Sequence, residues 1–246
     1  MKKQVSLIYC LGLLICSSSQ ANLSGSDDFN DNTMDPANWS ILFGDGLNET
    51  NNRLELSGFG GAWIWELNSG SYVQDWTVSL DVVNSVEESA MSNQETGFGF
   101  GAYTPGPFDN NFSVSLTAGD DAGGSSPYRR ILTEAEDSHA QVLDHAVDTT
   151  TTLLQLQISF DASAKVFTSY YDSGGGLTAL TNYNVSTWGM TDSDVFTIAI
   201  FGESLDASPA SGEVYGDNFV AIPEPGTLGL LGVAAGGLLL ARCKKR

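Results

Sequence analysis

Short runs in which apolar and polar residues alternate strictly are the main pattern in the middle of this 246-residue chain. Alternation with a period of two is typical of a β-strand with one face in an apolar core and the other toward water. The runs therefore predict strands that each bury one row of side chains. Four apolar rows have this form: Val78, Leu80 and Val82; Phe112, Val114 and Leu116; Leu154, Leu156, Ile158 and Phe160; and Phe196, Ile198 and Ile200.

Clusters of Gly, Ser, Asp and Pro separate these runs, for example at 120–127 and 172–176. Such clusters interrupt helices and strands alike and mark turns. We expect about a dozen strands in residues 22–221, although 134–146 fits either a helix or a strand and Trp188 fits a short turn or helix. Many short antiparallel strands predict an all-β fold, a two-sheet antiparallel β-sandwich or jelly roll.

The N-terminal segment has the form of a secretory signal peptide. Two lysines precede an apolar run, and Ser19 and Ala21 are small residues at the spacing that signal peptidase requires. We therefore predict that residues 1–21 form a signal helix that is removed during export. The alternative is a lipoprotein acylated on Cys16, which the bulky Ile15 before that cysteine disfavours.

A second apolar segment lies at the C-terminus. Residues 227–241 are apolar or small, follow Pro-Glu-Pro at 223–225, and precede a basic tail at 242–246. As a helix, this segment would span roughly 22 Å, less than the ~30 Å of a bilayer core. We predict a short transmembrane helix with its basic end in the cytoplasm and residues 22–221 on the other side of the membrane. The alternative is an ordinary single-pass anchor, which usually needs about 20 apolar residues.

The segment IPEPGTLGLLGVAAGGLLLARCKKR resembles the PEP-CTERM sorting signal of Gram-negative bacteria, with its Pro-Glu-Pro motif, apolar helix and basic end in order. The resemblance implies that residues 222–246 are processed during export by an exosortase, a transpeptidase-like enzyme of the inner membrane. It assigns recognition to Pro223, Glu224 and Pro225, with Gly226 next to the processing region. It also implies a surface or extracellular matrix protein of a species that makes exopolysaccharide and forms biofilms or flocs.

The two ends of the middle region resemble a second family. The opening DDFNDNTMDPANWSILFGDGLNETNNRLELSG and the closing GEVYGDNFVAI are similar to the first and last strands of concanavalin A-like lectin/glucanase domains. The shared features are an Asp-Phe start, a Trp on the next strand, an N-x-R-L-x-L strand and a final D-N-F strand. The resemblance implies a concanavalin A-like jelly roll in which the last strand lies beside the first. A galactose-binding-like jelly roll is the competing topology.

Acidic residues dominate the middle region. Residues 22–221 hold 29 Asp and Glu against four Lys and Arg, a formal charge of −25. This charge argues against nucleic acid as a partner, because phosphate contacts need clustered Lys and Arg. It fits either a salt-rich habitat that screens surface carboxylates or bound Ca²⁺, which takes carboxylate oxygens. If the first and last strands pair, Asp27 and Asp28 approach Asp217, and these three residues form the predicted calcium site.

No residue pattern predicts a catalytic pair. Glycoside hydrolysis needs two carboxyl groups about 5–9.5 Å apart across a cleft, and the chain has no laminarinase-like E-x-D-x-x-E run. Glu134 and Glu136 fall in a polar stretch that favours a solvated loop. Glu95 and Glu203 flank glycine-rich strands, but neither has an evident partner. Without a G-x-S-x-G motif, nucleophilic triad chemistry also lacks support.

Carbohydrate binding requires exposed aromatic rings with carboxyl and amide groups nearby. Trp63 and Trp65 share one face of a predicted strand, where they form either a sugar-binding platform or part of the core between the sheets. Tyr103 and Tyr170 are further candidates for contact with a sugar. The sequence leaves both interpretations of the tryptophan pair open.

These features together predict an exported, exosortase-processed surface or matrix protein. Its β-sandwich is expected to be a noncatalytic module that binds polysaccharide or has a structural role. The alternative is a glycoside hydrolase or lyase of the concanavalin A-like superfamily. The expected partners are signal peptidase, the exosortase and an exopolysaccharide, and the sequence predicts no cofactor other than Ca²⁺.

Overall fold

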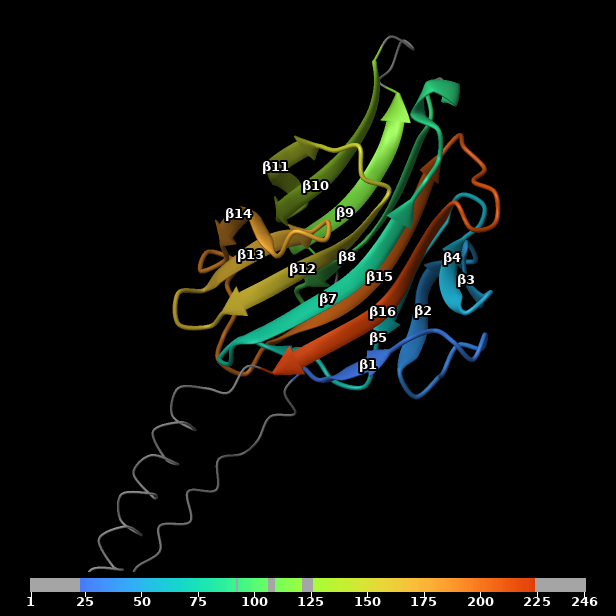
Figure 1. The fold of residues 1–246 in the computed structure, drawn as a ribbon. Helices are drawn as coiled ribbons and strands as arrows, with labels where there is room; N and C mark the ends of the chain where they lie inside the picture. The colour runs from blue at the N-terminus through green and yellow to red at the C-terminus, as the bar shows by residue number, and fades with distance from the viewer. Residues whose placement is uncertain (1–22, 92, 106–108, 121–125, 224–246) are drawn as a thin grey trace, which may run out of the picture.

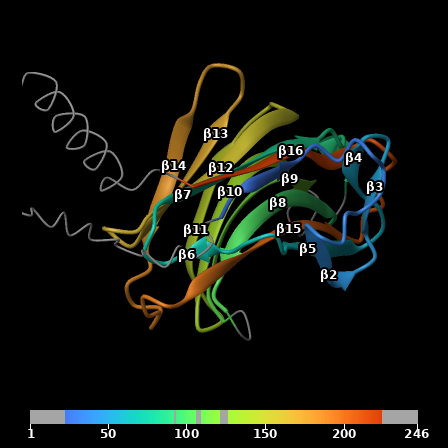
Figure 2. The same ribbon diagram turned by 90° about the horizontal axis from the view of Figure 1, so that it is seen from below.

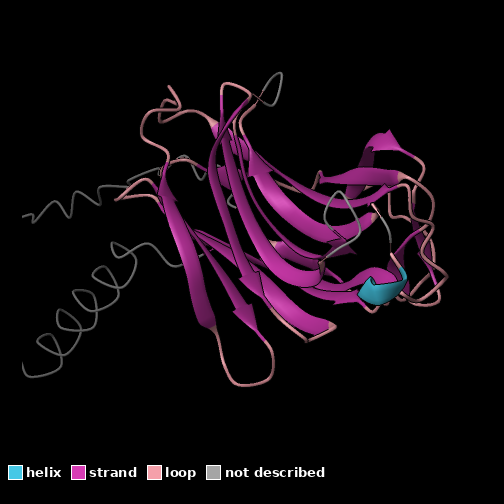
Figure 3. Ribbon diagram, turned by 90° about the horizontal axis from the view of Figure 1, so that it is seen from above, coloured by secondary structure: helices cyan, strands magenta, loops and turns pink. Residues whose placement is uncertain are grey.

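The computed structural model describes residues 23–91, 93–105, 109–120 and 126–223. Two antiparallel β-sheets, here called sheet A and sheet B, pack face to face (Figures 1 and 2). A short 3-10 turn at Glu88–Ala90 is the only helical element within the described ranges (Figure 3). The predicted all-β, two-sheet sandwich is therefore confirmed.

Sheet A contains eight strands. Their bounds are β1 Gly25–Asp27, β3 Leu47–Thr50, β4 Arg53–Leu56, β7 Trp76–Asn84, β12 Leu153–Asp161, β13 Val166–Asp172, β14 Thr178–Asn184 and β16 Val214–Pro223. Seven of them follow one another in the order β14-β13-β12-β7-β16-β4-β3, and β1 pairs with β16. The last strand of the sandwich therefore lies inside its sheet.

Sheet B also contains eight strands. Their bounds are β2 Trp39–Gly44, β5 Gly60–Trp65, β6 Gly70–Ser71, β8 Glu95–Tyr103, β9 Asn111–Asp120, β10 Pro127–Asp137, β11 Ala140–Asp148 and β15 Val195–Leu205. Their order is β11-β10-β9-β8-β15-β5-β2, and β6 pairs with β15. Because β8 to β11 follow one another in both chain and sheet, they form a meander.

The two ends of the described chain lie side by side (Figure 1). Asp27 of β1 pairs with Phe219 of β16, which confirms the implied pairing of first and last strands. β16 continues past the predicted domain end at residue 221, and Pro223 pairs with Trp76 of β7. The first proline of the Pro-Glu-Pro motif therefore belongs to the last strand of the sandwich.

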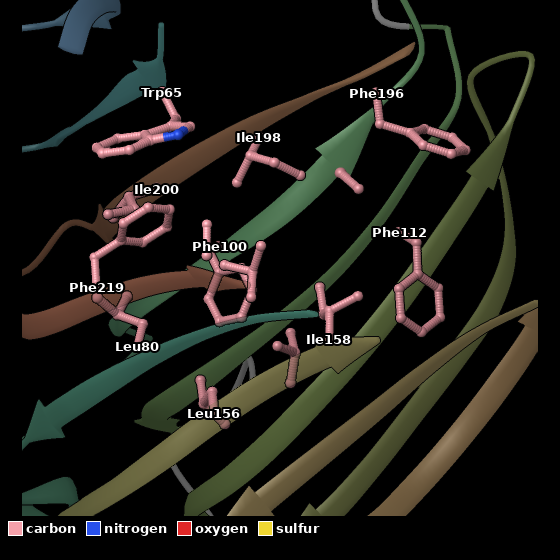
Figure 4. Close-up of a cluster of buried hydrophobic side chains, with 14 of the residues drawn as sticks. Trp65, Leu80, Phe100, Phe112, Leu156, Ile158, Phe196, Ile198, Ile200 and Phe219 are labelled. Atoms are coloured by element: carbon pink, nitrogen blue, oxygen red, sulfur yellow. The ribbon is translucent and has the colours of Figure 1, made fainter. Parts of the chain in front are cut away.

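The core between the sheets is built from the predicted apolar rows (Figure 4). In β7, β9, β12 and β15 the alternating apolar side chains are all at most 3% exposed, because each row faces the other sheet. Aromatic rings fill one end of this core, where the ring centres of Phe160 and Phe196 lie 5.1 Å apart. A buried hydrogen bond between the hydroxyl oxygens of Thr133 and Ser169, 2.9 Å apart, also joins the two sheets.

One detail differs from the sequence prediction, and two alternatives that the sequence left open are resolved. The described residues form sixteen strands instead of about a dozen, because several strands have fewer than five residues. Residues 134–146 form no helix: they belong to β10 and β11, which are joined by a tight turn in which Ser138 and His139 have positive φ angles of 54° and 65°. Trp188 lies in a turn after β14 and donates its backbone N–H to the carbonyl of Val185.

Both predicted terminal helices, at 1–21 and 227–241, lie outside the described residues. In the described part of the chain, no helix has the length and apolar character needed to cross a bilayer. Every described strand falls between Gly25 and Pro223, so a fragment of residues 22–223 contains the complete sandwich.

Candidate functional site

Small residues line part of a cleft on the outer face of sheet B, among them Gly60 and Ala62 of β5 and Ser113 of β9, and the neighbouring strand β8 is rich in glycine. Residues 95–103 of β8 have the sequence ETGFGFGAY. Phe98 and Phe100 point into the core, and the residues that alternate with them, Gly97, Gly99 and Gly101, face outward. A Cβ atom at Gly99 would collide with the carbonyl oxygen of Val114, so the close approach of β8 to β9 requires glycine there. The outward glycines pair with Ser113, Ser115 and Thr117 of β9.

Aromatic side chains form one wall of the cleft. Phe201 is on β15, Phe43 is on β2, and Phe59 is in the loop between β4 and β5. Phe43 is 58% exposed and Phe59 is 82% exposed. Neighbouring apolar side chains that remain this exposed are typical of a binding surface.

Carboxyl and amide groups form the opposite wall. Glu134 and Glu136 lie on β10, which pairs with β9 on one side and β11 on the other. The prediction of a solvated loop at these residues is therefore wrong. Gln141 donates to Glu134 and Asn111 donates to Glu136, both at 2.7 Å, and these bonds hold the two carboxylates beside the cleft.

The cleft between these walls has a volume of about 550 Å³. Glu203 of β15 lies over Gly97, where a Cβ atom would be 3.3 Å from its Oε1. β15 and β10 are three strand steps apart, with neighbouring strands about 4.8 Å from each other. In register Glu203 lies opposite Arg130, so a further four residues along the strands separate it from Glu134. An open cleft with this separation, with small side chains between its walls, has room for an extended polymer.

Two carboxyl groups of the cleft have raised pKa values. For Glu203, partial desolvation is the largest cause of the raised pKa, and the negative charges of Glu95 and Glu134 add to it. For Glu134, burial is again the largest cause, Asp144 raises the pKa further, and the hydrogen bond from Gln141 lowers it. Raised carboxyl pKa values in a cleft are typical of groups that transfer protons or meet a cationic partner.

Glu95 differs from the other cleft carboxylates because it has a basic partner. Arg130 Nη2 lies 3.8 Å from Glu95 Oε2, and the Tyr128 hydroxyl donates to the same carboxylate. The guanidinium of Arg130 also lies over the Tyr128 ring, 4.1 Å from its centre. The positive charge of Arg130 is therefore balanced by Glu95 within sheet B.

The structure contradicts the interpretation of Trp63 and Trp65 as a sugar-binding platform. Both residues are on β5, where they are only 4% and 2% exposed. The Trp65 ring centre lies 4.8 Å from those of Trp39 and Phe219. Both indoles belong to the core, because the row of β5 that contains them faces sheet A. Figure 4 shows Trp65 among the buried side chains.

The two candidate tyrosines lie on different sheets. Tyr103 ends β8 and lines the cleft, where burial and the nearby glutamates raise the pKa of its phenol. Tyr170 lies on β13 of sheet A, and Ser159 Oγ donates to its hydroxyl at 3.4 Å. Only Tyr103 is therefore placed to contact a ligand in the cleft.

The residues predicted to bind calcium lie where β1 meets β16. Asp27 accepts one hydrogen bond from a backbone N–H and one from Trp39 Nε1, both at 2.8 Å. Partial burial, with the charges of Asp81 and Asp28, raises the pKa of Asp217. Across the described ranges, no three Asp, Glu, His or Cys side chains are grouped closely enough to hold a metal ion. Calcium binding by Asp27, Asp28 and Asp217 stays a prediction.

Glu49 of β3 lies near the acidic residues Asp27 and Asp31, and its protonation can be tested through stability. Burial, followed by contact with the Asp31 carboxyl, raises the pKa of Glu49 to about 7. The folded state therefore binds this proton more tightly than the unfolded state between about pH 4.5 and pH 7, so its stabilising contribution is lost as the pH rises through that window.

We expect Glu49→Gln to raise the free energy of unfolding at pH 8 by about 1 kcal/mol and the melting temperature by about 2–4 °C. The reason is that Gln removes the carboxylate repulsion. Thermal melts at pH 4 and pH 8 measure this effect, which should vanish at pH 4. An equal gain in melting temperature at pH 4 and pH 8 would contradict the raised pKa of Glu49. An equal gain in the control variant Asp192→Asn, which changes an exposed carboxylate, would contradict it as well.

The C-terminal segment has a recognisable signature. Pro223 ends β16, whereas Glu224, Pro225 and Gly226 lie outside the described residues. Residues 221–246 match the PEP-CTERM protein-sorting motif. The PEP-CTERM motif indicates export, a membrane-anchored sorting signal and processing by an exosortase.

Solved structures similar to the sandwich include hydrolases and lectins. Over 80% of this chain and 39% of the other, the xyloglucan PUL GH43B protein of Bacteroides ovatus superposes with a TM-score of 0.57 at 14% identity. The winged bean acidic lectin in complex with methyl-alpha-D-galactose gives 0.52 at 11% identity, over 80% of this chain and 96% of the lectin. The CBM2 module of the evolved Dit of Lactobacillus casei BL23 phage J-1 gives 0.54 at 11%, over 81% and 94%.

These similarities establish the concanavalin A-like fold and leave the activity open. The chain spans about two fifths of the length of the GH43 proteins from Bacteroides ovatus and Bacillus licheniformis that it matches. Among curated proteins, no sequence matches this chain significantly.

The aromatic wall of the cleft was not predicted from the sequence. Phe43, Phe59 and Phe201 lie far apart in the chain, and only the order of strands in sheet B brings them together. One local signal was available. In the run EAE at 134–136, two acidic residues flank an apolar one at strand spacing, which places both carboxylates on the same face.

Proposed function

We propose that the protein is exported, processed by an exosortase and retained at the surface or in the extracellular matrix of a Gram-negative bacterium, where it binds polysaccharide. The binding site is the cleft of sheet B, and the bound chain is not cleaved. One observation carries this proposal: the cleft has exposed phenyl rings on one wall and carboxyl and amide groups on the other. Sugar rings stack on aromatic side chains while their hydroxyls bond to such polar groups.

The arrangement of the cleft supports binding to an extended chain. A smaller pocket formed by Phe59, Glu95 and Glu203 with two neighbouring residues continues from the main cleft, with which it shares Phe59 and Glu203. The combined depression runs across several strands of sheet B, from β2 to β10. A polymer lying across the strands would contact both walls over several sugar units.

A specific observation favours one other candidate function. Glu134 and Glu203 face the same cleft, and the pKa values of both carboxyl groups are raised, chiefly by burial and further by nearby acidic groups. A carboxyl group with a raised pKa can act as a general acid, and glycoside hydrolases use two such groups. A glycoside hydrolase or lyase acting on matrix polysaccharide is therefore the alternative.

Binding can be tested with fragment 22–223 by affinity electrophoresis in gels that contain single polysaccharides. We expect retardation by at least one of them. Phe59→Ala should weaken this binding about tenfold or more, because a ring that is 82% exposed contributes little to folding but would make a central stacking contact in the complex. Leu177→Ala is the matched control, since Leu177 is 48% exposed outside the cleft. Equal losses in both variants would contradict the site.

The same preparations separate the module from the enzyme. Each polysaccharide that retards the fragment is incubated with it, and new reducing ends and unsaturated ends are measured. The proposal expects none above the level in a protein-free sample. Chain cleavage that is abolished by Glu203→Gln or Glu134→Gln would establish the enzyme instead.

A further inference from the structure

The walls and floor of the sheet B cleft carry more negative charge than the described residues around it neutralise. Glu134, Glu136 and Glu203 come from two strands, and within the described ranges none of them forms an ion pair. Glu95 is paired with Arg130. The cleft thus holds three carboxyl groups whose counter-charges must come from elsewhere.

The remaining Arg and Lys side chains of the described sandwich are already engaged. Arg53 pairs with Glu55 at 2.7 Å, and Arg129 pairs with Glu88 at 3.1 Å. The third, Lys165, donates from Nζ to the backbone carbonyl of Tyr72 at 2.6 Å. A polysaccharide with uronate, sulfate or phosphate groups would therefore meet repulsion in this cleft without a basic side chain to receive it.

The opposite charge on a ligand would relieve this repulsion. An ammonium group near Glu203 or Glu134 stabilises the ionised carboxylate, and the partly desolvated setting strengthens the attraction. The aromatic wall adds to this, because cations are attracted to the faces of rings such as Phe43 and Phe59. Carboxylates on one wall and rings on the other therefore fit a chain that is both sugar-like and cationic.

We propose that the glycan bound in the sheet B cleft is cationic, a polysaccharide whose amino sugars carry free ammonium groups. This inference rests on the proposed function, because it names the ligand class of the same cleft. The recognising groups are the carboxylates of Glu134, Glu136 and Glu203, with Phe43 and Phe59 stacking on the sugar faces.

Isothermal titration of fragment 22–223 with three oligosaccharides of equal length tests the inference. The probes are a β-1,4-linked glucosamine hexamer, its fully N-acetylated counterpart, and an oligogalacturonate, at pH 6.5 and low salt. We expect the free amine hexamer to bind at least tenfold more tightly than the acetylated one, and the oligogalacturonate not to bind. Raising the salt concentration should weaken the amine complex most, because its attraction is electrostatic.

Two variants separate the cleft from the overall charge of the domain. Glu203→Gln should weaken binding of the glucosamine hexamer about tenfold and reduce its preference over the acetylated hexamer. Asp192→Asn removes one exposed carboxylate outside the cleft and should change the affinity less than twofold. Equal effects of both variants would overturn the inference, since general attraction by the charge of −25 would then explain the binding.

The outcomes distinguish this inference from the proposed function. Equal or tighter binding of the acetylated hexamer, or of the oligogalacturonate, would overturn the cationic ligand but leave a polysaccharide-binding cleft. Absence of binding to these probes and to every polysaccharide in the gel panel would overturn both.

Discussion

Replacing Pro223, Glu224 and Pro225 with Ala is expected to abolish processing of the exported chain almost completely in a host that has the matching exosortase. The Pro-Glu-Pro motif is the part of the PEP-CTERM segment 221–246 that the resemblance assigns to recognition. Alanine lacks both the fixed φ angle of proline and the carboxylate of Glu224, so the triple replacement removes the features that distinguish this motif. The triple variant should therefore remain as a full-length, membrane-bound precursor, as measured by immunoblots of membrane and released fractions.

A matched control keeps this result specific. Pro223 is exposed at the end of β16, so its replacement should leave the sandwich folded. Pro209→Ala changes a proline in a loop between β15 and β16 and should be processed normally. Unchanged release of the triple variant would show that the motif is not the signal, and failure of Pro209→Ala would point to a folding defect instead.

The second large effect concerns Trp39, whose replacement by Ala should destabilise the sandwich by about 3–5 kcal/mol. Trp39 is 1% exposed, and its ring centre lies 5.0 Å from that of Phe219 and 4.8 Å from that of Trp65. Its Nε1 also donates to Asp27, which joins β2 to the strand pair at the chain ends. Domains of this kind are stable by only about 5–15 kcal/mol, so the melting temperature should fall by roughly 10 °C.

Phe43→Ala is the control for Trp39→Ala, because both residues are aromatic and lie on β2. Phe43 is 58% exposed, so its loss should change the free energy of unfolding by less than about 0.5 kcal/mol. Denaturant titration of both variants measures the difference. A Trp39→Ala protein as stable as the parent would contradict the assignment of Trp39 to the core.

The fold was largely predictable because burial of one face leaves a period of two in the sequence. The apolar rows on β7, β9, β12 and β15 were each identified correctly, because apolar and polar residues alternate regularly along these strands. Residues 134–146 were ambiguous because β11 is an edge strand. Val142 on this strand is 47% exposed, so apolar and polar residues do not alternate clearly there. Register and strand order depend on contacts between distant segments, which no single sequence displays.

The candidate site was less predictable for the same reason. Glu203 and Glu134 lie 69 positions apart in the chain, and each has only local neighbours that suggest a surface position. Trp63 and Trp65 are close in the sequence, yet their role was also ambiguous. A shared strand face is equally compatible with a sugar-binding platform and with the core. The choice between those interpretations required knowledge of which side of β5 faces sheet A.

The central claim is that polysaccharide binds in the cleft of sheet B, and a crystal structure of fragment 22–223 with the tightest-binding oligosaccharide tests it most directly. The account predicts electron density for the sugar chain across β8 and β9, with Phe59 against a sugar face and Glu134 within hydrogen-bond distance of the ligand. An ordered oligosaccharide bound on sheet A, or at the sheet edges with the cleft empty, would contradict it.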